Sequence, residues 1–119
     1  MLSRFEIAQR YSRTQLETAG HPWVIWILNA KCVRLIRQAQ ATEPQPGVHR
    51  KNLLTHAQNL LAELEGSLKV TDELSKSLFY LYDYCYCLLD TEAPVDHALA
   101  LKVLSLLRDT FAALLHKRS

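Results

Sequence analysis

The side chains that could carry out chemistry are few, and their spacing does not assemble a site. The chain of 119 residues contains five histidines and three cysteines. Metal sites in helical bundles use Glu-x-x-His pairs, because residues three apart share the inward face of a helix. The sequence contains no such pair, and no His-Glu-x-x-His motif. No nucleophile or acid can be placed beside a histidine, so we expect surface or capping roles for all five: His21, His49, His56, His97 and His116.

The cysteines also lack the arrangement that a disulfide framework or a metal centre needs. Cys85 and Cys87 are two positions apart, so on a helix their side chains diverge by roughly 200° and can neither bridge nor share a metal ion. The sequence has no phosphate-binding loop, no Gly-x-Gly-x-x-Gly and no Gly-x-Ser-x-Gly. We therefore predict reduced thiols, no metal, no cofactor and no enzymatic activity.

Glycine and proline divide the sequence into segments that are long enough for helices. With 49% hydrophobic residues, 22% charged residues and only three glycines and four prolines, the composition favours a folded helical chain over a sandwich or barrel. We predict helices over about 22–41, 48–68, 72–90 and 94–117, after a head segment over 1–20. The whole chain, 1–119, has the size of a single domain.

Each predicted helix carries one apolar stripe with alternating spacings of three and four residues. Short connections force neighbouring helices of this length to run antiparallel, so the sequence predicts an all-α, up-down-up-down four-helix bundle. Thr71, followed by two acidic residues, predicts a capped start for the third helix. The predicted stripes are Ile25, Leu28, Cys32, Leu35 and Ala39; Leu54, Ala57, Leu61, Leu64 and Leu68; Leu74, Leu78, Leu81, Cys85 and Leu88; and Ala100, Leu104, Leu107, Phe111 and Leu114.

Charge and hydropathy exclude several classes of partner. Fourteen basic and twelve acidic residues give a formal charge of +2 and are largely intermixed along the chain, so we expect no nucleic-acid binding. Arg34, Arg37, Arg50 and Lys51 are expected to be solvated helix-end residues. The longest apolar run has six residues, far short of the roughly 20 that a membrane span needs. Because residues 1–17 lack the apolar stretch of a secretory signal, we expect a cytoplasmic protein without membrane insertion.

The first helix has more apolar residues than one core stripe can use. Opposite its stripe lie Trp23, Trp26, Ile27, Ala30 and Val33. One interpretation is that the head segment covers this face, with its Ile7 and Tyr11 against the tryptophans. The other is that an apolar helix of a partner lies there, because contiguous apolar patches usually mark interaction sites. Both hold if the head is a reversible lid.

A second excess of apolar residues lies on the third helix. Five aromatic residues occur within the eight positions 79–86. Phe79, Tyr82 and Tyr86 extend the core stripe sideways, and Tyr80 and Tyr84 lie on the other flank. Aromatic side chains suit interfaces, but they are also common at the rim of a bundle core. Two such faces without catalytic groups favour a protein that binds another protein.

Several stretches of the sequence resemble the flagellar secretion chaperone family FliS. They are Ala57-Gln58-Asn59-Leu60-Leu61-Ala62-Glu63-Leu64-Glu65-Gly66-Ser67-Leu68, then Leu78-Phe79-Tyr80-Leu81-Tyr82-Asp83-Tyr84, then Val103-Leu104-Ser105-Leu106-Leu107-Arg108-Asp109-Thr110, with Tyr11 and Thr18-Ala19 similar to the entry motif. The resemblance covers roughly residues 11–116. Where the family tends to have Tyr, an acid and Gly, this chain has Asn29, Ala30 and Lys31, which we expect near the client surface.

The resemblance implies an antiparallel four-helix bundle that binds the disordered C-terminal region of flagellin in the cytoplasm. Such a protein blocks premature polymerisation and escorts flagellin to the export apparatus, whose components are further implied partners. The apolar faces described above supply the residues that we predict to contact the client: Ile7, Tyr11, Trp23, Trp26, Ile27, Ala30, Val33, Phe79, Tyr82 and Tyr86. The alternative is a helical adaptor that self-associates through its tryptophans without a flagellin client. The first hypothesis fits a monomer or weak homodimer, and the second a stable dimer.

Overall fold

The computed structural model describes residues 22–41 and 48–116, and these form four helices. They are α3 (Pro22–Ala41), α4 (Val48–Ser67), α5 (Glu73–Leu89) and α6 (Pro94–His116). The four predicted helices are thus confirmed, with ends that differ by at most one residue. The predicted head segment, including Ile7 and Tyr11, lies outside the described residues.

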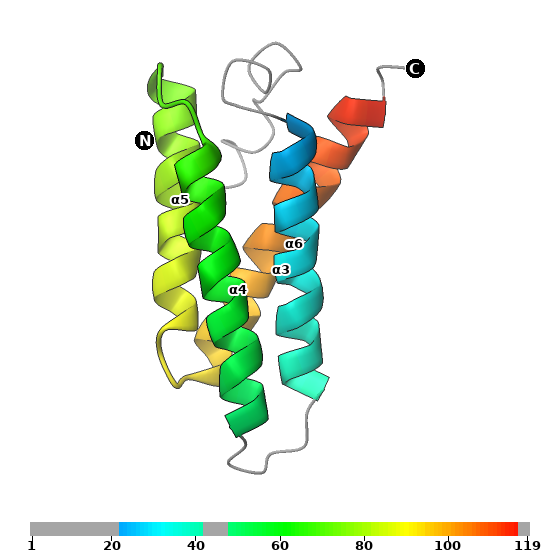
Figure 1. The fold of residues 1–119 in the computed structure, drawn as a ribbon, viewed down its shortest axis with the longest axis vertical. Coiled ribbons are helices and arrows are strands. Elements are labelled where there is room, and N and C mark those ends of the chain that lie inside the picture. The colour runs from blue at the N-terminus through cyan, green and yellow to red at the C-terminus, as the bar shows by residue number, and fades with distance from the viewer. Residues whose placement is uncertain (1–21, 42–47, 117–119) are drawn as a thin grey trace.

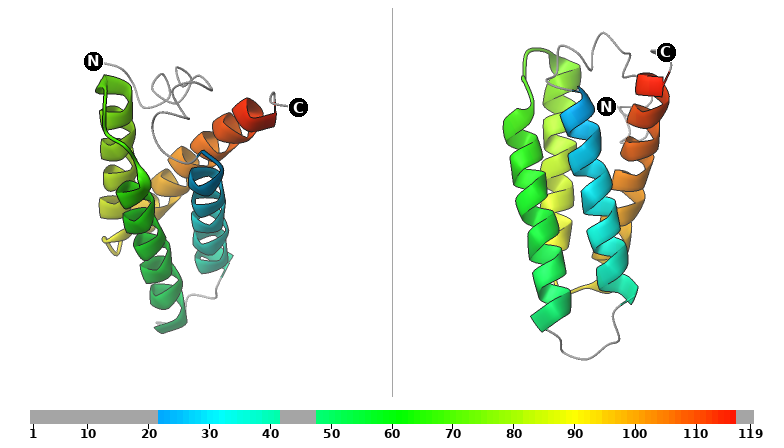
Figure 2. Two further views of the ribbon diagram at one scale, coloured as in Figure 1. Left: turned by 45° about the horizontal axis from the view of Figure 1, so that its top comes forward. Right: turned by 45° about the vertical axis from the view of Figure 1, so that its right-hand side comes forward.

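The helices alternate in direction and pack as a ring. Contacts join α3 to α4, α4 to α5, α5 to α6 and α6 back to α3 (Figure 1). The predicted all-α, up-down-up-down bundle is therefore confirmed. Helix α6 is inclined across the other three, as the left view of Figure 2 shows. This inclination carries the C-terminal end of α6 past the outer side of α3.

The core lies where the four apolar stripes meet. All five predicted stripe residues of α4 are buried: Leu54, Ala57, Leu61, Leu64 and Leu68. In α3 the buried arc is wider than predicted, because this helix packs against both α4 and α6. Leu35 is only half-buried, while Ile36 is fully buried.

A buried polar junction joins three helices inside this core. Asn29 is 0% exposed, and its Nδ2 donates to the carbonyl oxygen of Leu104 on α6 at 2.7 Å. The hydroxyl of Tyr82 on α5 donates to Asn29 Oδ1 at 2.9 Å. The expectation that Asn29 lies near the client surface is therefore wrong. Asn29 follows Ile25 by four residues, which places both on the same buried side of α3.

The ends of α5 are held by side chains. Its N-cap is Asp72, not Thr71: Asp72 Oδ1 accepts from the Ser75 backbone N–H at 2.7 Å, and Ser75 Oγ accepts from the Asp72 backbone N–H at 3.0 Å. Beyond the other end, His97 closes the connection to α6. Its Nε2 lies 2.7 Å from the carbonyl oxygen of Thr91, so Nε2 carries the proton of this bond. His97 is buried, at 4% exposure, and has a capping role rather than a surface role.

The three cysteines are free thiols. Cys32 and Cys85 are buried and Cys87 is exposed. Burial raises the pKa of Cys32 to about 12, and its Sγ donates to the carbonyl oxygen of Ala57 at 3.6 Å. Within the described residues, no group of three or more histidine, cysteine, aspartate or glutamate side chains could hold a metal ion. A search of the same residues finds no helix with the length and apolar character needed to cross a membrane.

Candidate protein-binding surface

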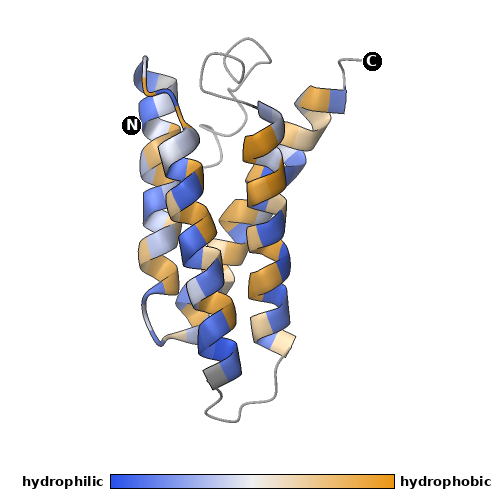
Figure 3. Ribbon diagram, in the orientation of Figure 1, coloured by the Kyte–Doolittle hydropathy of each residue, from blue (hydrophilic) through white to orange (hydrophobic). Residues whose placement is uncertain are grey.

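The first turns of α3 present two tryptophans on the outside of the bundle. Trp23 is 60% exposed, and its ring centroid lies 5.3 Å from that of Trp26 at an interplanar angle of 31°. Trp26 and Ile27 are half-buried beside it. We call these three residues the tryptophan surface. Figure 3 colours most of this part of α3 as hydrophobic, and the exposure of Trp23 and Val24 shows that the predicted apolar face reaches the exterior.

Trp26 has an unsatisfied donor within this surface. Its ring packs against the core, but the indole Nε1 is buried and has no hydrogen-bond partner. A buried N–H without an acceptor costs about 1–3 kcal/mol relative to a paired one. Trp26 therefore adds apolar area to the tryptophan surface, while its indole donor is closed off from solvent.

Farther along α3, the same side of the helix becomes a basic groove. A groove of about 450 Å³ lies between α3 and α6, and we call it the arginine groove. Ala30 is half-buried in its wall, whereas Val33 is fully buried, so the prediction that Val33 lies on the outer face is wrong. Helix α3 packs against both α4 and α6, so its buried arc is wide enough to include Val33. The residues that line the groove are Ala30, Val33, Arg34, Arg37, Gln38, Ala41 and Arg108.

The aromatic residues of α5 divide between the core and the exterior. Tyr80 is 59% exposed and meets the half-buried Phe79 edge-on, with ring centroids 6.0 Å apart. Tyr86 is half-buried. Tyr82 was predicted to extend the core stripe sideways and to contact the client, but it is 0% exposed and its hydroxyl reaches inward to Asn29, so it is not on the surface.

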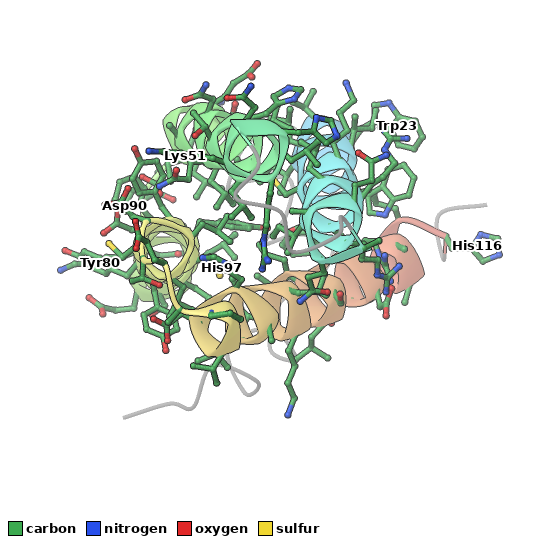
Figure 4. All side chains as sticks on the ribbon, turned by 90° about the horizontal axis from the view of Figure 1, so that it is seen from below. Trp23, Lys51, Tyr80, Asp90, His97 and His116 are labelled. Atoms are coloured by element: carbon green, nitrogen blue, oxygen red, sulfur yellow. The ribbon has the colours of Figure 1, made fainter. Side chains whose placement is uncertain are left out.

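The two aromatic surfaces do not form one continuous site. Helices α3 and α5 sit diagonally in the ring, with α4 and α6 between them. Figure 4 accordingly shows Trp23 and Tyr80 on opposite sides of the bundle. Of the predicted contact residues, the structure brings together Trp23, Trp26, Ile27 and Ala30 on one side, and places Phe79 and Tyr86 on another helix. An occupant of both surfaces has to pass around the bundle.

The charges are segregated rather than intermixed. Helix α3 has three basic side chains and no acidic one, whereas residues 62–96 contain eight acidic and two basic side chains. On the acidic side, burial and then the charge of Asp83 raise the pKa of Glu65, whose Oε1 is buried without a hydrogen-bond partner. The arginine groove was not predicted from the sequence, because Arg108 comes close to Arg34 and Arg37 only when α6 packs against α3. The absence of any acid in residues 22–41 was the available signal.

Fold and surface together define a class: a helical binding protein whose exterior carries one aromatic and basic side and one acidic side. The family model for the flagellar protein FliS matches residues 4–116 of the chain. The protein therefore belongs to the FliS family, a family of flagellar export chaperones rather than of enzymes. No curated protein and no solved structure matches the chain significantly.

Proposed function

We propose that this protein is a cytoplasmic export chaperone for flagellin. It binds the disordered C-terminal region of flagellin, prevents premature polymerisation and escorts the subunit to the flagellar type III export apparatus. The observation that supports this most is the tryptophan surface, in a chain that belongs to a family of flagellar export chaperones. A tryptophan with 60% exposure beside a second one is a large apolar area for a folded protein to leave uncovered.

Binding a disordered segment suits this surface. The client becomes ordered when it binds, so part of the contact energy is lost to ordering, and the complex can be released at the export site. Apolar side chains of the client pack against the rings of Trp23 and Trp26. Phe79, Tyr80 and Tyr86 on α5 form a second contact if the client passes around the bundle.

The tryptophans provide a direct test. The chain has two tryptophans, both on the tryptophan surface, so its emission reports this site alone. A flagellin C-terminal peptide should shift the emission to shorter wavelength. Calorimetry should show that Trp23→Ala with Trp26→Ala weakens binding about tenfold or more, because centrally placed aromatic anchors contribute most to interfaces. Val95→Ala, a control at an exposed apolar residue in the first turn of α6, should weaken binding less than about threefold.

Two results would contradict the proposal. Flagellin lacking its C-terminal region should lose binding; if it binds as tightly as the complete protein, that region is not the client segment. Light scattering addresses the adaptor alternative, in which two copies pair through the tryptophan surface. A stable dimer whose emission does not respond to the peptide would favour the adaptor over the chaperone.

A further inference from the structure

The arginine groove has the chemistry of a second binding site. We propose that it binds an acidic amphipathic helix of a partner protein, whose carboxylates pair with Arg34, Arg37 and Arg108 and whose small apolar side chains contact the groove wall at Ala30 and Ala41. This inference goes beyond the proposed function, because it holds whether or not flagellin is the partner.

The described residues around the groove do not neutralise its positive charge. Arg34 and Arg37 are exposed, and the described residues make no ion pair with either. Arg108 does pair with a carboxylate, because its Nε lies 3.0 Å from Oδ1 of Asp109. That carboxylate belongs to a side chain with 69% exposure and leaves the other guanidinium nitrogens of Arg108 available. The groove thus has three guanidinium groups, and only one of them is paired with an acidic side chain. A carboxylate of a partner is the complementary group.

The groove wall favours a helix over an extended polyanion. Ala30, Val33 and Ala41 are apolar and small, and Val33 is fully buried beneath the surface. Small residues allow the axis of a docking helix to approach closely. A nucleic acid binds through stacked bases and many phosphate contacts, and the groove lining contains no aromatic residue. The combination of an apolar wall and arginine edges matches a helix with carboxylates on both sides of an apolar strip.

The position of the groove suggests how long the partner helix is. Trp23, Trp26, Ala30 and Arg37 lie along one side of α3, and the line from Trp23 to Ala41 covers 18 residue steps, about 27 Å at 1.5 Å per residue. A docked helix of about 18 residues would therefore place its apolar end on the tryptophan surface and its acidic end in the arginine groove. The N-terminal segment of the chain itself is a poor occupant, because residues 1–21 contain three basic and two acidic residues.

A designed peptide tests this site. The probe is a fluorescein-labelled helical peptide of about 18 residues with glutamates on both sides of an alanine and leucine strip, and its affinity is measured by anisotropy. Arg34→Glu with Arg37→Glu should weaken binding about tenfold or more, because each change replaces attraction by repulsion. Arg50→Glu with Lys51→Glu makes the same change of net charge on α4, away from the groove, and should weaken binding less than about threefold.

A charge swap separates loss of the site from loss of the fold. The same peptide with lysine in place of every glutamate should bind the Arg34→Glu, Arg37→Glu variant more tightly than it binds the unmodified protein. Raising the salt concentration from about 50 to about 300 mM should weaken the binding of the acidic peptide to the unmodified protein. The lysine peptide should also bind this variant more tightly than it binds the Arg50→Glu, Lys51→Glu variant, which has the same net charge, and that difference requires a folded groove.

The proposal is overturned if the unmodified protein does not bind the acidic peptide, or if the two charge-reversal pairs weaken binding equally. The second result would mean attraction by net charge alone. A single-stranded RNA of similar charge that displaces the peptide at equal concentration would assign the groove to nucleic acid instead. Self-association that the Arg34→Glu, Arg37→Glu variant abolishes would assign it to the acidic side of a second copy.

Discussion

The outer side formed by α3 and α6 and the outer side formed by α4 and α5 cover the same core but differ in their polar groups. On the α3 side, Arg34 and Arg37 are exposed and form no ion pair with described residues. The side of α4 and α5 has mostly acidic side chains, and one of these carboxylates is bound within the helix pair. There Gln58 Nε2 donates to Asp90 Oδ1 at 3.2 Å and to the carbonyl oxygen of Tyr86 at 3.4 Å.

This difference shows how one bundle separates binding from scaffolding. Side-chain bonds within the α4 and α5 pair fix those helices to each other, so that pair depends little on an external partner. The α3 side leaves donors and aromatic area unused, which lowers the stability of the isolated protein but provides affinity when a partner arrives. Arginines without an ion pair, next to an exposed tryptophan, therefore distinguish the α3 side from the α5 side.

The largest expected effect is at the junction that connects the two sides. Asn29→Ala removes the bond to Leu104 O and the acceptor of the Tyr82 hydroxyl, and leaves a cavity. We expect a loss of about 2–4 kcal/mol in the free energy of unfolding, measured by urea denaturation. Asn59→Ala, the same change at an exposed position of α4, should alter it by less than about 0.5 kcal/mol. Equal effects of the two changes would show that the junction does not hold the helices together.

An intermediate effect is expected at the start of α5. Asp72→Ala breaks the capping box with Ser75, so unfolding should become easier by about 1 kcal/mol. Asp109→Ala removes an exposed ion pair with Arg108 and should change stability by less than about 0.5 kcal/mol. Thermal unfolding followed by circular dichroism measures both. If Asp72→Ala also weakens the binding of the acidic peptide to the arginine groove, the two sides of the bundle are coupled. The separation of binding and scaffold sides described above would then be wrong.

The smallest effect tests the acidic side. The pKa of Glu65 is raised above its ordinary value of 4.5 in the folded protein, so folding favours the protonated form. The stability that this group contributes is present at low pH and is lost as pH rises through the folded pKa. Glu65→Gln should therefore raise the free energy of unfolding by about a few tenths of a kcal/mol at about pH 7, and leave it unchanged at about pH 3. A rise of equal size at both pH values would contradict the assigned cause.

The sequence by itself determined the four helices and most of the core. Apolar spacing and proline or glycine breaks are local signals, so the stripe of α4, from Leu54 to Leu68, and the bounds of α3 follow from them without tertiary information. The exposure of Trp23 could be predicted in the same way, because it lies opposite a strong core stripe. The motifs of α4 and α5 also indicated the family that the chain belongs to.

Only the tertiary structure decided that Asn29, Val33 and Tyr82 are buried. A helical wheel gives the direction of a side chain but not the number of neighbouring helices, and α3 has α4 on one side and the inclined α6 on the other. Packing of α3 against both helices therefore buried Val33, paired Asn29 with Leu104, and brought Arg108 to Arg34 and Arg37 across more than 70 residues of sequence. Sites made by such long-range contacts have no local signature, since their residues meet only when the helices pack.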